Sequence, residues 1–111
     1  MDKLENYRNI IKKVIGEYAA IPYIYGDIES RTMFDAENDS YMLYSVGWNS
    51  RGRIHGINIH VEIINGKIYI QHDGTEDGIA TDLEAAGVPK SDIVLAFHAP
   101  ELRKHTEYAV I

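Results

Sequence analysis

The chain has 111 residues, a formal net charge of −6 and no cysteine. Its length fits one domain, residues 1–111, and its 45% hydrophobic and 25% charged residues are typical of a folded globular protein. The lack of cysteine excludes disulfides and thiolate zinc sites. A net negative charge opposes non-specific binding to nucleic acid, because phosphate attraction drives that binding. No apolar run approaches the roughly 20 residues of a bilayer span, and the first residues lack a signal-peptide core. We therefore expect a cytoplasmic protein without membrane contact or specific nucleic-acid binding.

The first predicted element is an amphipathic helix. Asp2 and Glu5 have the spacing of a capping box at its start. Apolar residues then recur at steps of three and four from Leu4 to Tyr18, which is the stripe of a half-buried helix. Pro22 closes the pattern, so the spacing predicts that the helix ends at residue 20 or 21.

A period of two replaces the helical period from Asp27 onward. It predicts strands over residues 28–34 and 42–48, with a turn at 36–39 and a hairpin connection at 49–52. Tyr41 and Leu43 fall on the face opposite Trp48, so apolar groups lie on both faces. Such a sheet is covered on both sides or uses one side for a partner, and a homodimer is one predicted assembly.

Residues 57–71 give the clearest signal, a hairpin that turns at Asn65-Gly66. This dipeptide suits a two-residue turn in which both positions take positive φ. The resulting register pairs apolar with apolar and polar with polar residues, and it places Ile59, Val61, Ile63, Ile68 and Ile70 in the core. It also predicts that His60 lies opposite Gln71 and Ile59 opposite His72, which would bury His72. The opposite, wetter face is the candidate partner-binding face: Asn58, His60, Glu62, Tyr69 and Gln71.

A second, short helix is predicted after this hairpin. Thr75 is its expected N-cap and Gly87 its C′ residue. Residues 93–97 read as a short buried strand, 101–104 as one helical turn, and 108–110 as a terminal strand. The fold class is therefore α+β: an antiparallel meander of about four to five strands with an N-terminal helix and a second short helix.

No motif for catalysis, a cofactor or a metal stands out. The five histidines lack ligand spacing, and the phosphate-loop, calcium-loop and nucleophile-elbow patterns are absent. Asp35, Glu37 and Asp39 alternate near a turn, which favours a solvated turn over a cation site. His60 and Glu62 share a strand face, so a small ligand-binding or enzymatic site there is an alternative to a partner-binding face.

The ordered segments of the chain resemble the XisI-like family, the fdxN element excision controlling factors of cyanobacteria. The matching residues run through nearly the whole chain and include Gly47-Trp48, Gly66-Lys67-Ile68, Gly74-Thr75-Glu76, Gly87-Val88-Pro89-Lys90 and Asp92-Ile93-Val94-Leu95. Tyr69 stands where the family tends to have Trp, and Ala96 where Gly is common.

The resemblance implies a small α+β accessory protein that is not an enzyme: it carries over no catalytic residue, and the recombinase activity in that system belongs to another protein. It implies action through a companion, XisH, in the programmed excision of a DNA element during heterocyst development. XisH-like proteins resemble endonuclease folds, so the alternative is an antitoxin-like inhibitor of a nuclease-fold neighbour.

Overall fold

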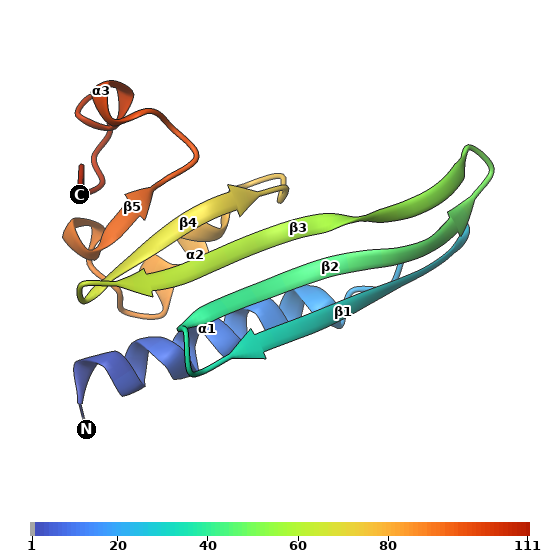
Figure 1. Cartoon of the computed structure of the whole chain (residues 1–111), viewed down its shortest axis with the longest axis horizontal. Coiled ribbons are helices and arrows are strands. Elements are labelled where there is room, and N and C mark those ends of the chain that lie inside the picture. Colours follow the sequence, from blue (N-terminus) through green and yellow to red (C-terminus); the bar gives the residue numbers. More distant parts are fainter. Residues whose placement is uncertain (1) are drawn as a thin grey trace.

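The computed structural model describes residues 2–111, which form one five-stranded sheet with the two longer helices packed on one side (Figure 1). The strand order follows the sequence, β1-β2-β3-β4-β5. The first four strands form the predicted antiparallel meander, whereas β5 runs parallel to β4, so the sheet is mixed. The elements are α1 (Lys3–Ala19), β1 (Asp27–Asp35), β2 (Ser40–Asn49), β3 (Gly52–Ile64), β4 (Lys67–Asp73), α2 (Ile79–Ala85), a 3-10 turn η1 (Lys90–Asp92), β5 (Ile93–Leu95) and α3 (Pro100–Arg103).

Helix α1 begins and ends close to the predicted residues. The Asp2 carboxylate accepts a hydrogen bond from the Leu4 N–H at 2.9 Å and so caps the first turn. The Glu5 carboxylate, which was predicted to complete a capping box with Asp2, instead lies 3.5 Å from the Arg8 guanidinium. The helix ends at Ala19, one residue earlier than expected, with Ala20 as its C-cap.

The core lies between the sheet and the two helices α1 and α2. The sheet supplies alternate residues of β2, β3 and β4, as the hairpin register predicts, and both helices supply their apolar stripes. The largest fully buried side chains are Tyr41, Ile11, Ile15, Ile59, Ile68, Ile70, Ile79, Leu83 and Ile93. Burial of each such aliphatic side chain contributes about 1.5–3 kcal/mol, so this layer is the main source of stability.

Two β-bulges change the predicted register. Glu62 lies opposite Tyr69 and Val61 opposite Ile70, as predicted, but the register shifts between His60 and Val61. His60 therefore faces His72, and Gln71 is the extra residue of β4. The prediction that His72 is buried was wrong, because the bulge turns it outward and its side chain is exposed.

Helix α2 starts three residues later than the sequence predicts. Thr75 is not its N-cap; Gly78, with φ of +87°, occupies that position. The Asp73 carboxylate accepts hydrogen bonds from the N–H groups of Thr75 and Ile79 at 2.9 and 2.8 Å, while the Thr75 hydroxyl accepts one from Gly78. The side chains of Asp73 and Thr75 thus accept hydrogen bonds from the backbone N–H groups of a tight loop, at the place where the sequence predicts the first turn of the helix. At the other end Gly87 has φ of +109°, as predicted.

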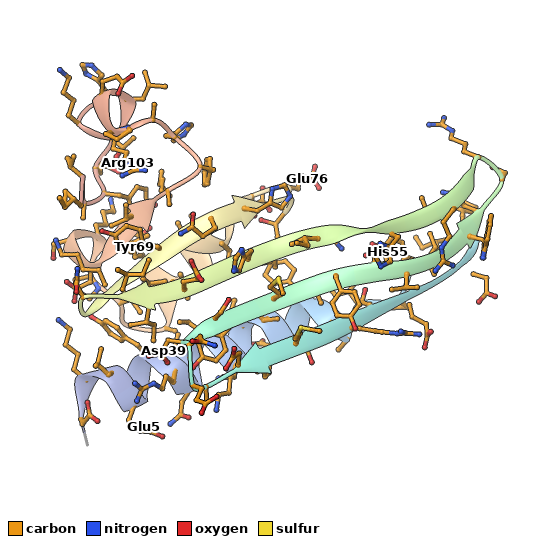
Figure 2. The ribbon with its side chains drawn as sticks, viewed as in Figure 1. Glu5, Asp39, His55, Tyr69, Glu76 and Arg103 are labelled. Atoms are coloured by element: carbon orange, nitrogen blue, oxygen red, sulfur yellow. The ribbon has the colours of Figure 1, made fainter. Side chains whose placement is uncertain are left out.

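The C-terminal segment protects one edge of the sheet. Ala109 forms a parallel bridge to Val94 of β5, and its N–H donates to the Ile93 carbonyl at 2.9 Å. Arg103, labelled in Figure 2, stabilises this segment. Its guanidinium donates hydrogen bonds to the carbonyls of His98, Ala96 and Val110 at 2.9–3.3 Å. The predicted helical turn at residues 101–104 is α3, and the predicted terminal strand is this single bridge.

The far part of β1, β2 and β3 projects beyond the helices, and we call it the arm (residues 27–30, 45–49 and 52–57; Figure 1). The molecule measures 41 × 33 × 24 Å, and its radius of gyration is 14.6 Å, against roughly 13 Å expected for a compact chain of this length. The arm accounts for this elongation.

Candidate functional site

The face of the sheet opposite α1 and α2 is the open face, and Figure 1 views the molecule from this side. Strand alternation and the observed register define it. Its residues on β2, β3 and β4 include Met42, Tyr44, Val46 and Trp48, then Arg53, His55, Ile57, His60 and Glu62, and then Tyr69 and Gln71, and β1 adds Glu29, Arg31 and Met33. In Figure 2, Tyr69 lies near the turn of the last hairpin and His55 lies out on the arm.

A polar cluster of Ser40, His60, Glu62 and Gln71 occupies the near part of this face. The Ser40 hydroxyl lies 2.9 Å from His60 Nε2, and the Gln71 amide donates to Glu62 Oε1 at 3.1 Å. His60 and Glu62 are each about a quarter exposed and lie 3.8 Å apart. The structure therefore brings together four of the five predicted face residues: His60, Glu62, Tyr69 and Gln71.

Asn58 is not part of the open face, which corrects the fifth assignment. The register between β2 and β3 shifts so that Leu43 faces Ile59 and Tyr44 faces Ile57, leaving Asn58 as the extra residue. Its side-chain amide donates to the Ser45 hydroxyl at 2.5 Å, and Ser45 is buried on the helix side of the sheet. Simple alternation missed the bulge because nothing in residues 57–59 marks it.

The outer part of the open face is apolar and partly exposed. Trp48 and Ile57 are 58% and 48% exposed. The Arg53 guanidinium lies 5.3 Å from the centre of the Trp48 ring, within the range of a cation–π contact. The face thus joins an aromatic–arginine contact on the arm to a hydrogen-bonding cluster over the core.

The Ser40, His60 and Glu62 side chains resemble the parts of a hydrolytic triad, but their geometry is different. Both Ser40 and Glu62 approach the same ring nitrogen, Nε2 of His60. A triad places the hydroxyl and the carboxylate on opposite nitrogens, so that the acid orients the ring while the base takes the proton. The arrangement therefore differs from a triad and forms a hydrogen-bonding surface. Within residues 2–111, no group of three or more His, Cys, Asp or Glu side chains is placed to hold a metal ion.

Beneath the arm, on the helix side, a cleft of about 820 Å³ was not predicted from the sequence. The segment after α1 lines it, with Tyr23 held in place because its hydroxyl lies 2.6 Å from Ser45 Oγ. Ile24 and Tyr25 of the same segment are 86% and 83% exposed. The only sequence signal was the concentration of tyrosine and isoleucine in residues 21–25.

Asp39 links the start of the sheet to α1 (Figure 2). Its carboxylate accepts from Arg8 Nε at 2.8 Å, from Arg8 Nη2 at 3.1 Å and from the Tyr41 hydroxyl at 3.0 Å. The Arg8 hydrogen bonds, supported by that of Tyr41, hold the pKa of Asp39 below its ordinary value. Burial, with the hydrogen bond to Asp39, raises the pKa of Tyr41 to about 12.

The fold and this surface define a small mixed α+β protein with one helix-covered and one open sheet face. Among the described helices, none is long and apolar enough to cross a membrane.

The family model for the XisI protein matches residues 1–110. The fdxN element excision controlling factor XisI from Anabaena variabilis ATCC 29413 is 34% identical, with 99% of this chain and 100% of that chain covered and a TM-score of 0.85. A XisI-like protein from the same organism has the same identity and coverage and a TM-score of 0.89. No curated protein matches the chain. The chain belongs to the XisI family, which confirms the resemblance drawn from its sequence.

Proposed function

We propose that this protein is a non-enzymatic accessory factor that controls excision of a DNA element by binding an XisH-like protein through its open face. The observation that carries the proposal is the polar cluster of Ser40, His60, Glu62 and Gln71, preorganised beside Tyr69 on a face that none of the described helices covers. The proposal is also supported by the name of the solved homologue from Anabaena variabilis, an fdxN element excision controlling factor.

The chemistry of the open face suits protein recognition. Interfaces are enriched in tyrosine, tryptophan and arginine, and their strongest contacts centre on such residues surrounded by polar groups. Here Tyr69 stands beside Glu62, and Trp48 stacks with Arg53. Because hydrogen bonds within the sheet already fix the polar cluster, little side-chain entropy is lost when a partner binds.

The test is co-expression with an XisH-like protein from the same genome, followed by pull-down and measurement of the dissociation constant. We expect Tyr69→Ala to weaken the complex by about tenfold or more, as for a central interface tyrosine. Glu62→Lys reverses a charge in the polar cluster, and Glu37→Lys makes the same change in the exposed β1–β2 turn. Only the first of these two should weaken binding, while both should leave the melting temperature near that of the parent.

Two results would overturn different parts of this proposal, the identity of the partner and the location of the binding surface. If no complex forms with the parent protein, the partner is wrong. If a complex forms and neither Tyr69→Ala nor Glu62→Lys weakens it, the open face is not the binding surface. A nuclease assay on the same samples separates the antitoxin alternative, in which the partner cleaves DNA alone and stops when this protein is added.

A further inference from the structure

The two edges of the sheet differ in whether another segment of the chain pairs with them. The β5 edge is bridged by Ala109 of the C-terminal segment, but no element of residues 2–111 pairs with the outer side of β1 (Figure 1). Strand β1 is nine residues long and has no proline, no lysine and no bulge in its register with β2; its charged residues, Asp27, Glu29, Arg31 and Asp35, are of both signs. An unpaired strand of this kind is a template for a further strand.

The charges of β1 match a second copy of β1 in one antiparallel register. A two-fold axis perpendicular to the sheet pairs residues of the same face and keeps the helices of both copies on one side. With this axis at Ser30, Glu29 of each copy lies opposite Arg31 of the other. Glu29 and Arg31 both lie on the open face, are 67% and 48% exposed, and already lie within 2.8 Å in one chain.

Neighbouring registers fail because they place like charges opposite each other. An axis at Glu29 or at Arg31 sets that residue against its own copy. An axis at Ile28 sets Asp27 against Glu29, and an axis at Thr32 sets Glu29 against Asp35. Like charges directly opposite on paired strands are destabilising. The pattern D-I-E-S-R-T-M-F-D of β1 therefore selects Ser30 as the centre among these five positions.

The same register brings exposed apolar side chains together at both ends of the paired strands. Phe34 comes opposite Gly26 of the other copy, beside Ile24 and Tyr25 of that copy. Phe34 is 38% exposed, and Ile24 and Tyr25 are the most exposed large hydrophobic residues of the described chain. Burying them adds apolar area to the backbone hydrogen bonds of the joined strands.

We propose that two copies of this protein associate through β1 in this register, forming one continuous ten-stranded sheet. The dimer leaves both open faces free, so it goes beyond the proposed binding of an XisH-like protein and is tested on the purified chain alone.

The first experiment is a charge exchange followed by sedimentation velocity over a concentration series. Glu29→Arg alone and Arg31→Glu alone each place like charges in two cross-strand pairs, and each should weaken the dimer about tenfold or more. The double variant should dimerise again. An equimolar mixture of the two single variants should also form a mixed dimer, whereas the double variant should not pair with the parent. Glu37→Arg, an equal charge change outside the edge, should have no effect.

The second experiment uses the absence of native cysteine. Ser30→Cys places one thiol next to the axis, within the 4.4–6.8 Å Cα separation that disulfides require, and should cross-link rapidly on mild oxidation. Ser50→Cys at the exposed tip of the arm is the control and should cross-link slowly. A parent protein that stays monomeric at about 100 μM, single variants that dimerise like the parent, or equal cross-linking at both positions would each overturn the proposal.

Discussion

Removing the charge of Asp39 tests whether the contact between α1 and the sheet contributes strongly to stability. Asp39 has φ of +49°, a left-handed conformation that asparagine adopts as readily as aspartate, so Asp39→Asn keeps the shape of the turn. The change leaves Arg8 facing a neutral amide and weakens the bond from Tyr41.

The side chains of Arg8 and Asp39 are 26% and 20% exposed, so water screens this ion pair only in part. A two-pronged hydrogen bond to a charged group contributes about 1.5–3 kcal/mol. We expect Asp39→Asn to lower the free energy of unfolding by about 2 kcal/mol, which corresponds to a fall in melting temperature of about 9 °C for this chain length. Glu37→Gln in the same turn is the matched control and should change the melting temperature by less than about 2 °C.

The dependence on pH follows from the lowered pKa of Asp39. A carboxylate with a lower pKa in the folded state stabilises the fold above its unfolded pKa of about 3.9, and this contribution is lost as pH falls through the folded pKa. Urea unfolding should therefore show a constant difference between parent and Asp39→Asn from pH 5 to 7, which shrinks below pH 4. A difference under about 0.5 kcal/mol at pH 7, or one that grows in acid, refutes the reasoning.

Three further predictions concern stability. Gly16 lies in the last turn of α1, on its exposed side and with open space around it, so Gly16→Ala should raise the free energy of unfolding by up to about 1 kcal/mol in urea titration; a loss would contradict this. A Cβ at Gly47 would lie 2.0 Å from the Asp27 carbonyl, so Gly47→Ala should cost at least about 2 kcal/mol and loosen β1, seen as faster amide exchange in that strand. Burial and carboxylate hydrogen bonds raise four tyrosine pKa values to about 12. Stability should therefore fall as pH rises from 10 to 12, with these phenols ionising in absorbance at 295 nm only as the protein unfolds. The four residues are Tyr7, Tyr18, Tyr41 and Tyr108.

The sequence predicts those parts of the fold where a local pattern coincides with burial. The α1 stripe, the Asn65-Gly66 turn and the Val61–Ile70 pairing are correct because hydrophobic period, turn chemistry and core packing favour the same arrangement. Gly87 ends α2 as predicted, since a C′ glycine is a strong local signal.

The sequence-based predictions are wrong where contacts between distant parts of the chain determine the local structure. Residues 58 and 71 are bulge residues, and a pattern of alternating side chains carries no mark of an inserted residue. Thr75 has the properties of an N-cap, and its hydroxyl does accept from the Gly78 N–H, but the Asp73 carboxylate accepts from the N–H groups of Thr75 and Ile79, so residues 75–78 form a loop and the helix begins only at Ile79. Asp39 was predicted to lie in a solvated turn, because its partner Arg8 is 31 residues away in sequence.

Because of the arm, the same strands have two levels of local stability along their length. Where β3 lies over the helices, Ile59 and Val61 are fully buried, and those amides should open only when the whole domain unfolds. Residues 52–57 of the same strand have no buried side chain, so the tip can fray and re-form without disturbing the core. One continuous hairpin therefore carries a fixed hydrogen-bonding cluster at its base and an adaptable aromatic surface at its end.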